Sequence, residues 1–272
     1  MDENSLRERI RAARDFVKPY AEDEDILTDQ EMKLPQPPLY KAPMRDEMIA
    51  LPVSFEDLAI DRDFLHIINS RESRRVYTQE MMKLEEISYL LWCMQGIKRI
   101  RGKRYATLRT VPSGGGRHPF EVYMTVRRVE GLRDGYYHYL PQHHSLELLR
   151  SEEDMAGFIA DSLMGQKWAA RANVVFYFSF VCYRAEWRYS FFAHRVALID
   201  AGHITQNLYL AATSLGRGGC AVGSVDKGLA DQAFELDGEE EFIFYAMPVG
   251  TVSEQVKKEE EDFYRFVKED GL

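Results

Sequence analysis

The segment Ser70–Tyr77 contains the side chains best suited to hold a phosphate group. Its sequence, Ser-Arg-Glu-Ser-Arg-Arg-Val-Tyr, brings Arg71, Ser73 and Arg75 close together in the chain. A guanidinium pairs bidentately with phosphate oxygens and remains charged at any relevant pH. The cluster suits a phosphate monoester, although taken alone it is more typical of a solvated basic turn.

A second candidate for ligand contact is the loop Val111–Phe120, which combines three consecutive glycines with a serine, a histidine and two prolines. Glycines permit close approach of the backbone to a ligand, and the flanking prolines stiffen the entry and exit. The loop lacks the G-x-x-x-x-G-K-[ST] spacing of a nucleotide triphosphate loop, so ATP chemistry is disfavoured. His118 alone is more typical of a structural hydrogen-bonding residue than of a catalyst.

A long helix from Arg195 to Leu215 must position these loops, because apolar residues recur in it at helical spacing. About 20 residues at 1.5 Å per residue span ~30 Å, the width of a domain. Gly202 and the alanines leave little bulk, so the helix is either the spine of the core or the seam of a dimer. Gly216 should end it, and the glycine-rich run to Ser224 either lies against a planar ring or forms a tight turn.

The remaining elements predict an α+β fold with a mixed β-sheet flanked by helices. Residues 1–25 suit an amphipathic helix, and a proline-rich strap follows, so residues 1–54 form an extension and a single domain spans 55–272. The basic run from Lys98 to Arg104 is expected to be a solvated loop. We expect further helices at 61–68, 84–95 and 154–164, and strands at 122–126, 135–140, 146–149, 173–183 and 241–249.

Composition excludes several classes of function. The chain has 272 residues, 45% of them hydrophobic, without an apolar run that could span a bilayer, and its charged N-terminus does not resemble a signal peptide. We therefore expect a cytoplasmic protein without a membrane partner. A net charge of −9 argues against a nucleic-acid partner, and three cysteines without a C-x-x-C pair predict reduced thiols and no metal site.

Four blocks of sequence together resemble the FMN-dependent nitroreductase family, and within it the SagB-type dehydrogenase branch. They are SRESRRVY (70–77), ISYLLWCMQG (87–96) with RTVPSGGGRHPFEVY (109–123), DAGHITQNLYLAATSLG (200–216), and GGCAVGSVD (218–226) with FYAMPVG (244–250). Their order and spacing carry the resemblance, which covers residues 64–250. It implies an FMN bound at a homodimer interface, with residues of both subunits around each flavin.

The resemblance also implies the roles of the phosphate-binding residues. Arg71, Ser73 and Arg75 match the family's R-x-S-x-R contacts to the phosphate and the ribityl chain of FMN. Glu72 departs from the basic or histidine residue often found at its position. We expect this departure to lower the affinity for FMN without abolishing FMN binding.

Two further segments match residues beside the flavin ring. Pro112, Ser113 and Gly114 match the loop next to the isoalloxazine, and Gly223 with Ser224 matches the backbone near its reactive edge. The residues themselves agree with this interpretation, because glycines suit a planar ring and a helix of small residues suits a subunit seam.

Arg188 and Tyr189 occupy the position of a Lys-Tyr pair that the branch's azoline oxidases carry. Arginine cannot readily give up its proton, so a general-base role is not expected. Arg188 could instead orient an anionic substrate or stabilise developing charge, and Tyr189 could donate a proton. An exposed arginine beside a packing tyrosine is an equally good interpretation.

Three functions follow from these expectations. The first is an FMN oxidoreductase that passes hydride from NAD(P)H, through the flavin, to a second small-molecule substrate. The second is a SagB-type dehydrogenase that oxidises an azoline or a related ring in a peptide or small metabolite. The third is a non-catalytic flavin-binding or partner-binding protein that docks through Met1–Pro52.

Overall fold

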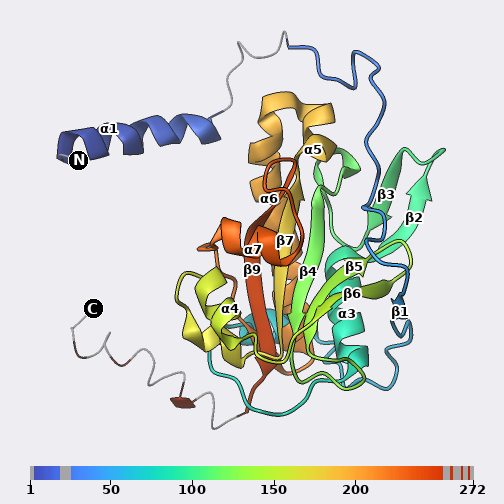
Figure 1. Ribbon diagram of the computed structural model, residues 1–272, viewed down its shortest axis with the longest axis vertical. Coiled ribbons are helices and arrows are strands. Elements are labelled where there is room, and N and C mark those ends of the chain that lie inside the picture. The colour runs from blue at the N-terminus through green and yellow to red at the C-terminus, as the bar shows by residue number, and fades with distance from the viewer. Residues whose placement is uncertain (1–2, 19–25, 254–257, 260–264, 266–268, 270–272) are drawn as a thin grey trace.

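A seven-stranded antiparallel sheet forms the centre of the computed structural model, which describes residues 3–18, 26–253, 258–259, 265 and 269 (Figure 1). The strand order is β1-β6-β5-β4-β7-β9-β8, and β2 and β3 form a separate hairpin. Parallel pairing in the described residues is limited to isolated bridges such as Ser73 to Gly219. The strands are β1 (Ile49–Ala50), β2 (Ile97–Arg101), β3 (Ala106–Arg109), β4 (Phe120–Val126), β5 (Gly135–Leu140), β6 (Ser145–Ser151), β7 (Val174–Val181), β8 (Arg217–Gly219) and β9 (Glu241–Thr251).

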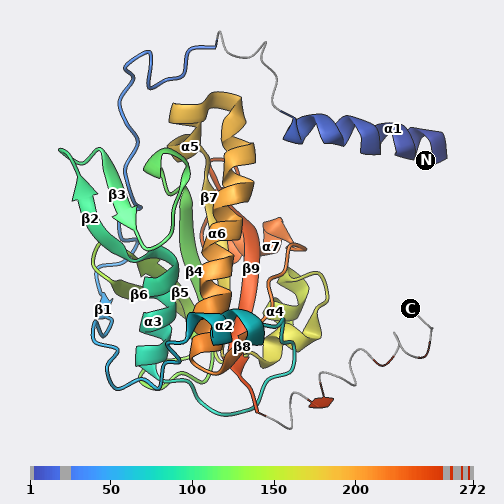
Figure 2. The same cartoon turned by 180° about the vertical axis from the view of Figure 1, so that it is seen from behind.

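Helices cover both faces of this sheet, which confirms the expected α+β class. Helices α2, α3 and α6 lie on one face (Figure 2), and α4 and α7 lie on the other (Figure 1). The helices are α1 (Glu3–Ala13), α2 (Phe64–Ser70), α3 (Leu84–Gln95), α4 (Ala156–Ser162), α5 (Cys182–Tyr189), α6 (Ala193–Ser214) and α7 (Lys227–Ala233). In the described residues, no helix is long and apolar enough to cross a bilayer.

The two inner strands β4 and β7 divide the core into two layers. Val122 and Phe176 point toward α3 and α6, whereas Tyr123 and Tyr177 pack in the layer of α4 and α7. Because successive side chains of a strand point to opposite faces, a strand covered on both faces is apolar throughout. This explains the continuous apolar run that predicted a central strand here.

Helix α6 is buried along one side only. Ala201 and Leu208 are buried against the sheet, whereas Leu198 and Ile199 are 42% and 57% exposed. Within one chain, α6 is therefore covered on the side of the sheet and open to solvent on the other. Gly216 follows the helix with φ +65°, the left-handed conformation that ends many helices.

Residues 26–52, which we call the strap, are tied to the sheet. Its two-residue strand β1 pairs with β6, and Leu39 and Leu51 are buried. Upstream, α1 is helical as expected, but Leu6 and Ile10 of its apolar side are 45% and 52% exposed. The rest of the predicted N-terminal helix, residues 1–2 and 19–25, lies outside the described residues.

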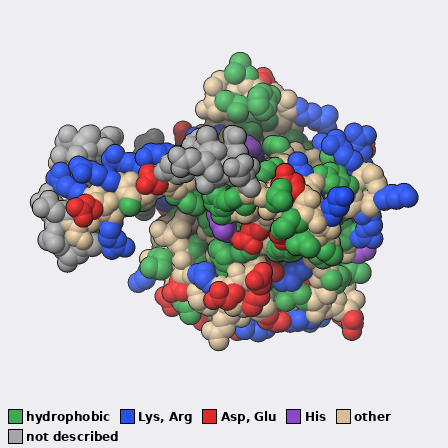
Figure 3. Space-filling model, turned by 90° about the horizontal axis from the view of Figure 1, so that it is seen from above, with side chains coloured by type: hydrophobic (Ala, Val, Ile, Leu, Met, Phe, Trp, Pro, Cys, Tyr) green, Lys and Arg blue, Asp and Glu red, His purple; other side chains and the backbone are tan. Residues whose placement is uncertain are grey.

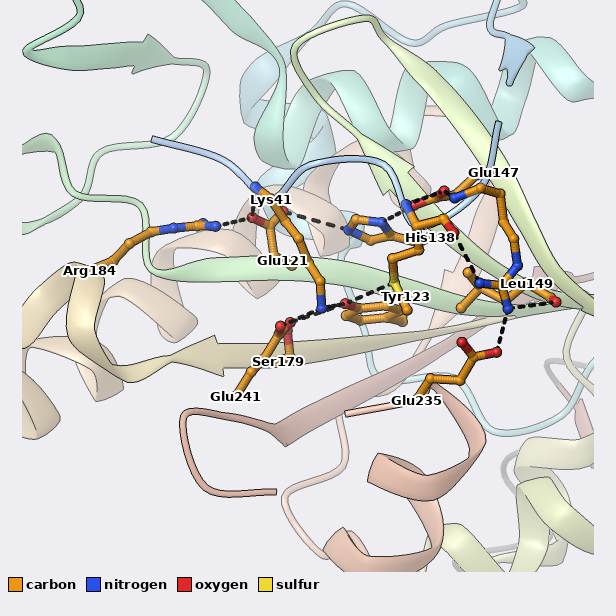
Figure 4. A network of polar contacts seen from close by, with 12 residues as sticks. Lys41, Glu121, Tyr123, His138, Glu147, Leu149, Ser179, Arg184, Glu235 and Glu241 are labelled. Carbon is orange, nitrogen blue, oxygen red and sulfur yellow. Dashed lines mark hydrogen bonds and ion pairs between the residues drawn. The ribbon is translucent and has the colours of Figure 1, made fainter. Parts of the chain in front are cut away.

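A network of charged side chains is buried between the strap and the sheet (Figure 4). Glu121 on β4 pairs with Arg184 at 2.5 Å and accepts the backbone N–H of Lys41 at 2.8 Å. His138 on β5 bonds Glu147 on β6 at 2.6 Å, and its Nε2 lies 3.8 Å from Glu121 Oε2. The backbone N–H groups of the strap thus satisfy carboxylates that the sheet buries.

The charges in this network set one another's ionisation. Burial raises the pKa of Glu121, but the charges of Arg184 and His138 outweigh it and hold that pKa well below its usual range. Burial lowers the pKa of His138, yet Glu121 and Glu147 outweigh burial and raise it, which favours the protonated imidazole. The charges in the network pair with charges of opposite sign, and this attraction offsets the free-energy cost of removing them from water.

Two of the differences from the predicted elements lie close to the candidate site. The basic run Lys98–Arg104 is largely the antiparallel β2–β3 hairpin rather than a loop, although its side chains are exposed as expected. The strand predicted to reach Tyr183 ends at Val181, because α5 begins at Cys182. At this point the Val181 N–H donates to Pro119 O and the Cys182 N–H donates to Glu240 O, and the local sequence does not reveal these contacts with distant segments.

Candidate active site

The segment Arg71–Arg75 is extended along the edge of the sheet. The Arg74 N–H donates to Gly219 O at 2.9 Å. In extended backbone, alternate side chains point to opposite sides. Accordingly, Arg71 lies 5.5 Å from the ring centre of Tyr209 and the Ser73 hydroxyl lies 3.2 Å from the Tyr209 hydroxyl.

The other charged side chains of the segment have different neighbours. Arg74 forms an ion pair with Glu72 at 2.5 Å, so the acidic residue at position 72 neutralises Arg74 rather than Arg71. The Arg75 guanidinium lies 5.9 Å from the ring centre of Trp168. Arg74 is therefore in an ion pair, whereas the guanidiniums of Arg71 and Arg75 each lie near an aromatic ring.

Tyr209 on α6 also connects this segment to the glycine-rich run. Its hydroxyl accepts the Ala221 N–H at 2.7 Å, and Val222 forms an antiparallel bridge with Ala246. Gly223 and Ser224 follow directly and are exposed. The structure thus brings the predicted residues Arg71 and Ser73 together with the segment that leads to Gly223.

The glycine loop, residues 112–116, is fixed at the other half of α6. The Ser113 hydroxyl donates to Asp200 at 2.6 Å and the Gly114 N–H donates to the same carboxylate at 3.0 Å. Asp200 is 2% exposed, and burial raises its pKa although both hydrogen bonds lower it. Pro112 is exposed at the start of the loop.

Arg188 and Tyr189 at the end of α5 pack against this loop. Gly115 has φ +55°, and a Cβ there would lie 2.3 Å from Arg188 Cδ, so only glycine fits without a shift. Arg188 Nη1 donates to Gln30 of the strap at 2.6 Å and to the Tyr105 hydroxyl at 2.9 Å. Interaction with Tyr189 raises the pKa of Arg188, so its guanidinium stays charged.

The two groups of predicted residues lie apart along α6. Asp200, which holds the glycine loop, and Tyr209, which meets Arg71 and Ser73, are nine residues apart, or about 14 Å along a helix axis. One chain therefore does not bring Ser113 and Arg71 together. A ligand that contacts both groups must be long or must lie between two chains.

Two residues of this site were not predicted from the sequence. Asp200 was detectable as a carboxylate within an otherwise apolar stretch of helix, since a buried charge needs partners. Tyr209 gave no such signal. Its partners Ser73 and Ala221 are 136 and 12 positions away, and only the fold brings them together.

Replacing Asp200 by leucine should destabilise the protein by about 2 kcal/mol, because the Ser113 hydroxyl and the Gly114 N–H lose their acceptor. Urea unfolding measures this loss, and faster amide exchange at Gly114 locates it. The comparison variant Ser113→Ala removes one donor to Asp200 and the acceptor of the His118 N–H, but it keeps the Gly114 bond, so exchange at Gly114 should rise less than in Asp200→Leu. Equal exchange at Gly114 in the two variants would show that Asp200 does not hold this N–H.

His118 should make the protein less stable in mild acid. Burial, together with the charge of Arg109, lowers the pKa of His118 to about 2. Below about pH 6.5 the unfolded chain therefore binds a proton that the folded chain does not, and the free energy of unfolding falls by up to about 1.4 kcal/mol per pH unit. His118→Asn, which tolerates the positive φ here, should lose this slope between about pH 6.5 and 4 in urea titrations. Equal slopes in both proteins would contradict the assignment.

Comparisons with known proteins show which family the chain resembles. The sequence profile described as the nitroreductase family matches residues 68–251. A Methanocaldococcus jannaschii protein that bears the name nitroreductase is 32% identical over 184 residues, covering 68% of this chain and 88% of the relative. The trifolitoxin-processing protein TfxB of Rhizobium leguminosarum is 31% identical over 133 residues, which are 47% of this chain and 36% of that protein.

A solved structure shows the same fold. The crystal structure of a Ralstonia eutropha protein named as a nitroreductase superimposes with a TM-score of 0.62 at 24% identity, covering 81% of this chain and 95% of that chain. The family profile and the M. jannaschii relative place the chain in the class of oxidoreductases. Within that class, the chain belongs to the nitroreductase family.

Proposed function

We propose that the protein is an FMN-dependent oxidoreductase that takes hydride from NAD(P)H and passes it to a small-molecule acceptor. The observation that carries the proposal is the convergence at Tyr209, whose hydroxyl meets Ser73 and the Ala221 N–H and whose ring lies beside Arg71. Guanidinium and hydroxyl donors beside permissive backbone match the phosphate and ribityl groups of FMN. The donor set therefore fits this cofactor.

Each residue has a defined task in this proposal. Arg71 and Arg75 would bind the phosphate, Ser73 the ribityl chain, and the backbone of Gly223 and Ser224 would face the ring. When bound, FMN supplies the hydride acceptor, and the protein determines position and electrostatics. Arg188 remains charged beside the glycine loop and would orient an anionic substrate, with Tyr189 as a proton donor.

A homodimer would complete this site. Pro112, Ser113 and Gly114 lie about 14 Å from Tyr209 along α6, so we propose that they contact the flavin held by a second subunit. Exposed apolar side chains on α2 and α6 support this pairing, because burying them against a second subunit removes apolar surface from water. They are Phe64 (67% exposed), Leu65 (68%), Ile68 (41%), Leu198 (42%) and Ile199 (57%).

The proposal is tested by mixing the FMN-loaded protein with NADH or NADPH under anaerobic conditions and following the visible absorption of the flavin. Rapid bleaching supports a nicotinamide donor and argues against the non-catalytic alternative. Sedimentation velocity on the same sample should give twice the chain mass of 31.6 kDa. A protein that cannot be loaded with FMN would overturn the proposal, and a monomer that retains FMN would overturn its dimeric form.

A second candidate is the oxidation of an azoline or related ring in a peptide. The similarity to the trifolitoxin-processing protein supports it. The raised pKa of Arg188 opposes it, because a guanidinium that stays protonated cannot act as the base. If this assignment is right, the wild type should oxidise an azoline peptide and Arg188→Lys should raise the rate, whereas absence of the activity in both proteins would contradict it.

A further inference from the structure

A cavity of about 480 Å³ lies beside the glycine loop, within the range of small-molecule sites. Lys98 and Arg101 of β2 line one side of it. Pro112 and Ser113 of the loop line another, and His118 lies in the same lining. The cavity therefore extends from a basic strand to the residues proposed to face the flavin.

The surroundings of the cavity carry an unusual excess of positive charge. Residues 96–120 include seven lysines and arginines and no aspartate or glutamate, in a chain whose net charge is −9. In Figure 3, Lys and Arg side chains gather at the right-hand edge, the side on which Figure 1 places β2 and β3. A local field of this sign attracts anions to the cavity.

Some of these cations already serve the fold. Arg109 is 4% exposed and donates to Gln95 at 2.9 Å and to the Leu39 carbonyl at 3.1 Å. Arg117 donates to the Tyr105 carbonyl at 2.7 Å. These two side chains therefore act as structural groups rather than as free ligands for an anion.

Lys98 and Arg101 differ from these structural arginines. Both are exposed, and no ion pair joins either side chain to a carboxylate within the described part of the chain. Burial keeps the pKa of neighbouring His118 well below its usual value, so the histidine adds no charge. Arg109 also lines the cavity, but its guanidinium is buried and hydrogen-bonded, so Lys98 and Arg101 are the lining cations that remain exposed to a ligand.

We propose that Lys98 and Arg101 bind the phosphate groups of the nicotinamide dinucleotide that reduces the flavin. This inference rests on the proposed function and adds the part of the site that recognises the donor. Arginine forms bidentate bonds with phosphate and lysine binds it as a point charge, which suits an elongated dianion. With its phosphates on β2, the dinucleotide would extend toward Pro112 and Ser113, where the hydride is needed.

The test compares Lys98→Gln/Arg101→Gln with Arg99→Gln/Lys103→Gln. Both variants remove two charges from the same exposed hairpin, but Arg99 and Lys103 do not line the cavity. The first measurement is calorimetric titration of each protein with inorganic pyrophosphate. The second is anaerobic flavin reduction by NADH, by NADPH and by 1-benzyl-1,4-dihydronicotinamide, an uncharged hydride donor.

We expect the cavity variant to bind pyrophosphate and at least one dinucleotide roughly tenfold more weakly than the wild type, and the control variant to change little. FMN content and reduction by the uncharged donor should be unchanged in both. Loss with NADH and NADPH alike assigns the pyrophosphate bridge, whereas loss with NADPH alone assigns the 2′-phosphate.

Three results would overturn the inference. The first is that the two variants weaken pyrophosphate binding equally. The second is that the cavity variant is reduced as slowly by the uncharged donor as by the dinucleotides. The third is that the cavity variant differs from the wild type only in reoxidation of its flavin by a carboxylated acceptor. If no nicotinamide reduces the wild-type flavin, the proposed function fails and the dinucleotide assignment fails with it. The pyrophosphate titration then still decides whether Lys98 and Arg101 form an anion site.

Discussion

Replacing Glu121 by leucine should lower the free energy of unfolding by about 3–5 kcal/mol, because it leaves the Arg184 guanidinium buried without its partner. Arg184 is 4% exposed and pairs with Glu121 at 2.5 Å. The substitution also removes the acceptor of the Lys41 N–H and one of the two carboxylates beside His138. Urea unfolding monitored by tryptophan fluorescence measures the loss.

The double variant Glu121→Leu/Arg184→Met provides the matched control. Replacing both members of a buried ion pair by apolar residues is often nearly neutral, so the double variant should recover much of the stability lost in the single one. The remaining loss should reflect the strap bond at Lys41 and the pairing of His138. A double variant at least as unstable as the sum of the single variants would show that the two charges do not stabilise each other.

Replacing Arg71 and Arg75 together by glutamine should raise the dissociation constant for FMN roughly 100-fold. Each charge-assisted contact to a phosphate contributes about 1.5 kcal/mol or more, and about 1.4 kcal/mol corresponds to a factor of ten. Fluorescence titration of the flavin-free protein with FMN measures the change. Riboflavin, which lacks the phosphate, should bind the variant and the wild type with similar affinity.

Arg74→Gln is the control. It removes one positive charge from the same segment, but the charge that it removes is paired with Glu72. It should change FMN affinity less than threefold. An equal loss in this control would mean that the whole basic segment acts only through long-range charge. Undiminished FMN binding in the double variant would show that the phosphate site has been assigned to the wrong residues.

The sequence predicted the elements that residues close together in the chain determine. Helix α3 has the predicted bounds Leu84–Gln95, because its apolar residues recur at helical spacing and Gly96 follows. Strand β7 was predicted from an apolar run, since a strand covered on both faces needs no polar alternation. The proximity of Arg71 and Ser73 also followed from their adjacency in the chain.

Other features depend on contacts between distant segments. Strand β2 of the β2–β3 hairpin consists largely of charged, exposed residues, so hydrophobic periodicity could not indicate it. The separation of Ser113 from Arg71 depends on which half of α6 each loop contacts, through Asp200 and Tyr209. The same applies to Arg188, whose partner Gln30 is 158 positions away in the strap.

The strap also has a consequence for the order in which the protein folds during synthesis. Its Lys41 ammonium bonds Glu241 at 2.6 Å, 200 positions later in the chain, and β1 pairs with β6. Contacts between such distant residues carry a large loop-closure cost and form slowly. The strap is synthesised before β9, so it must wait for β9 before it can dock fully, and until then the carboxylates of β4 and β6 lack its N–H groups. Relative to the sheet that it covers, the strap is made early and reaches its native position late.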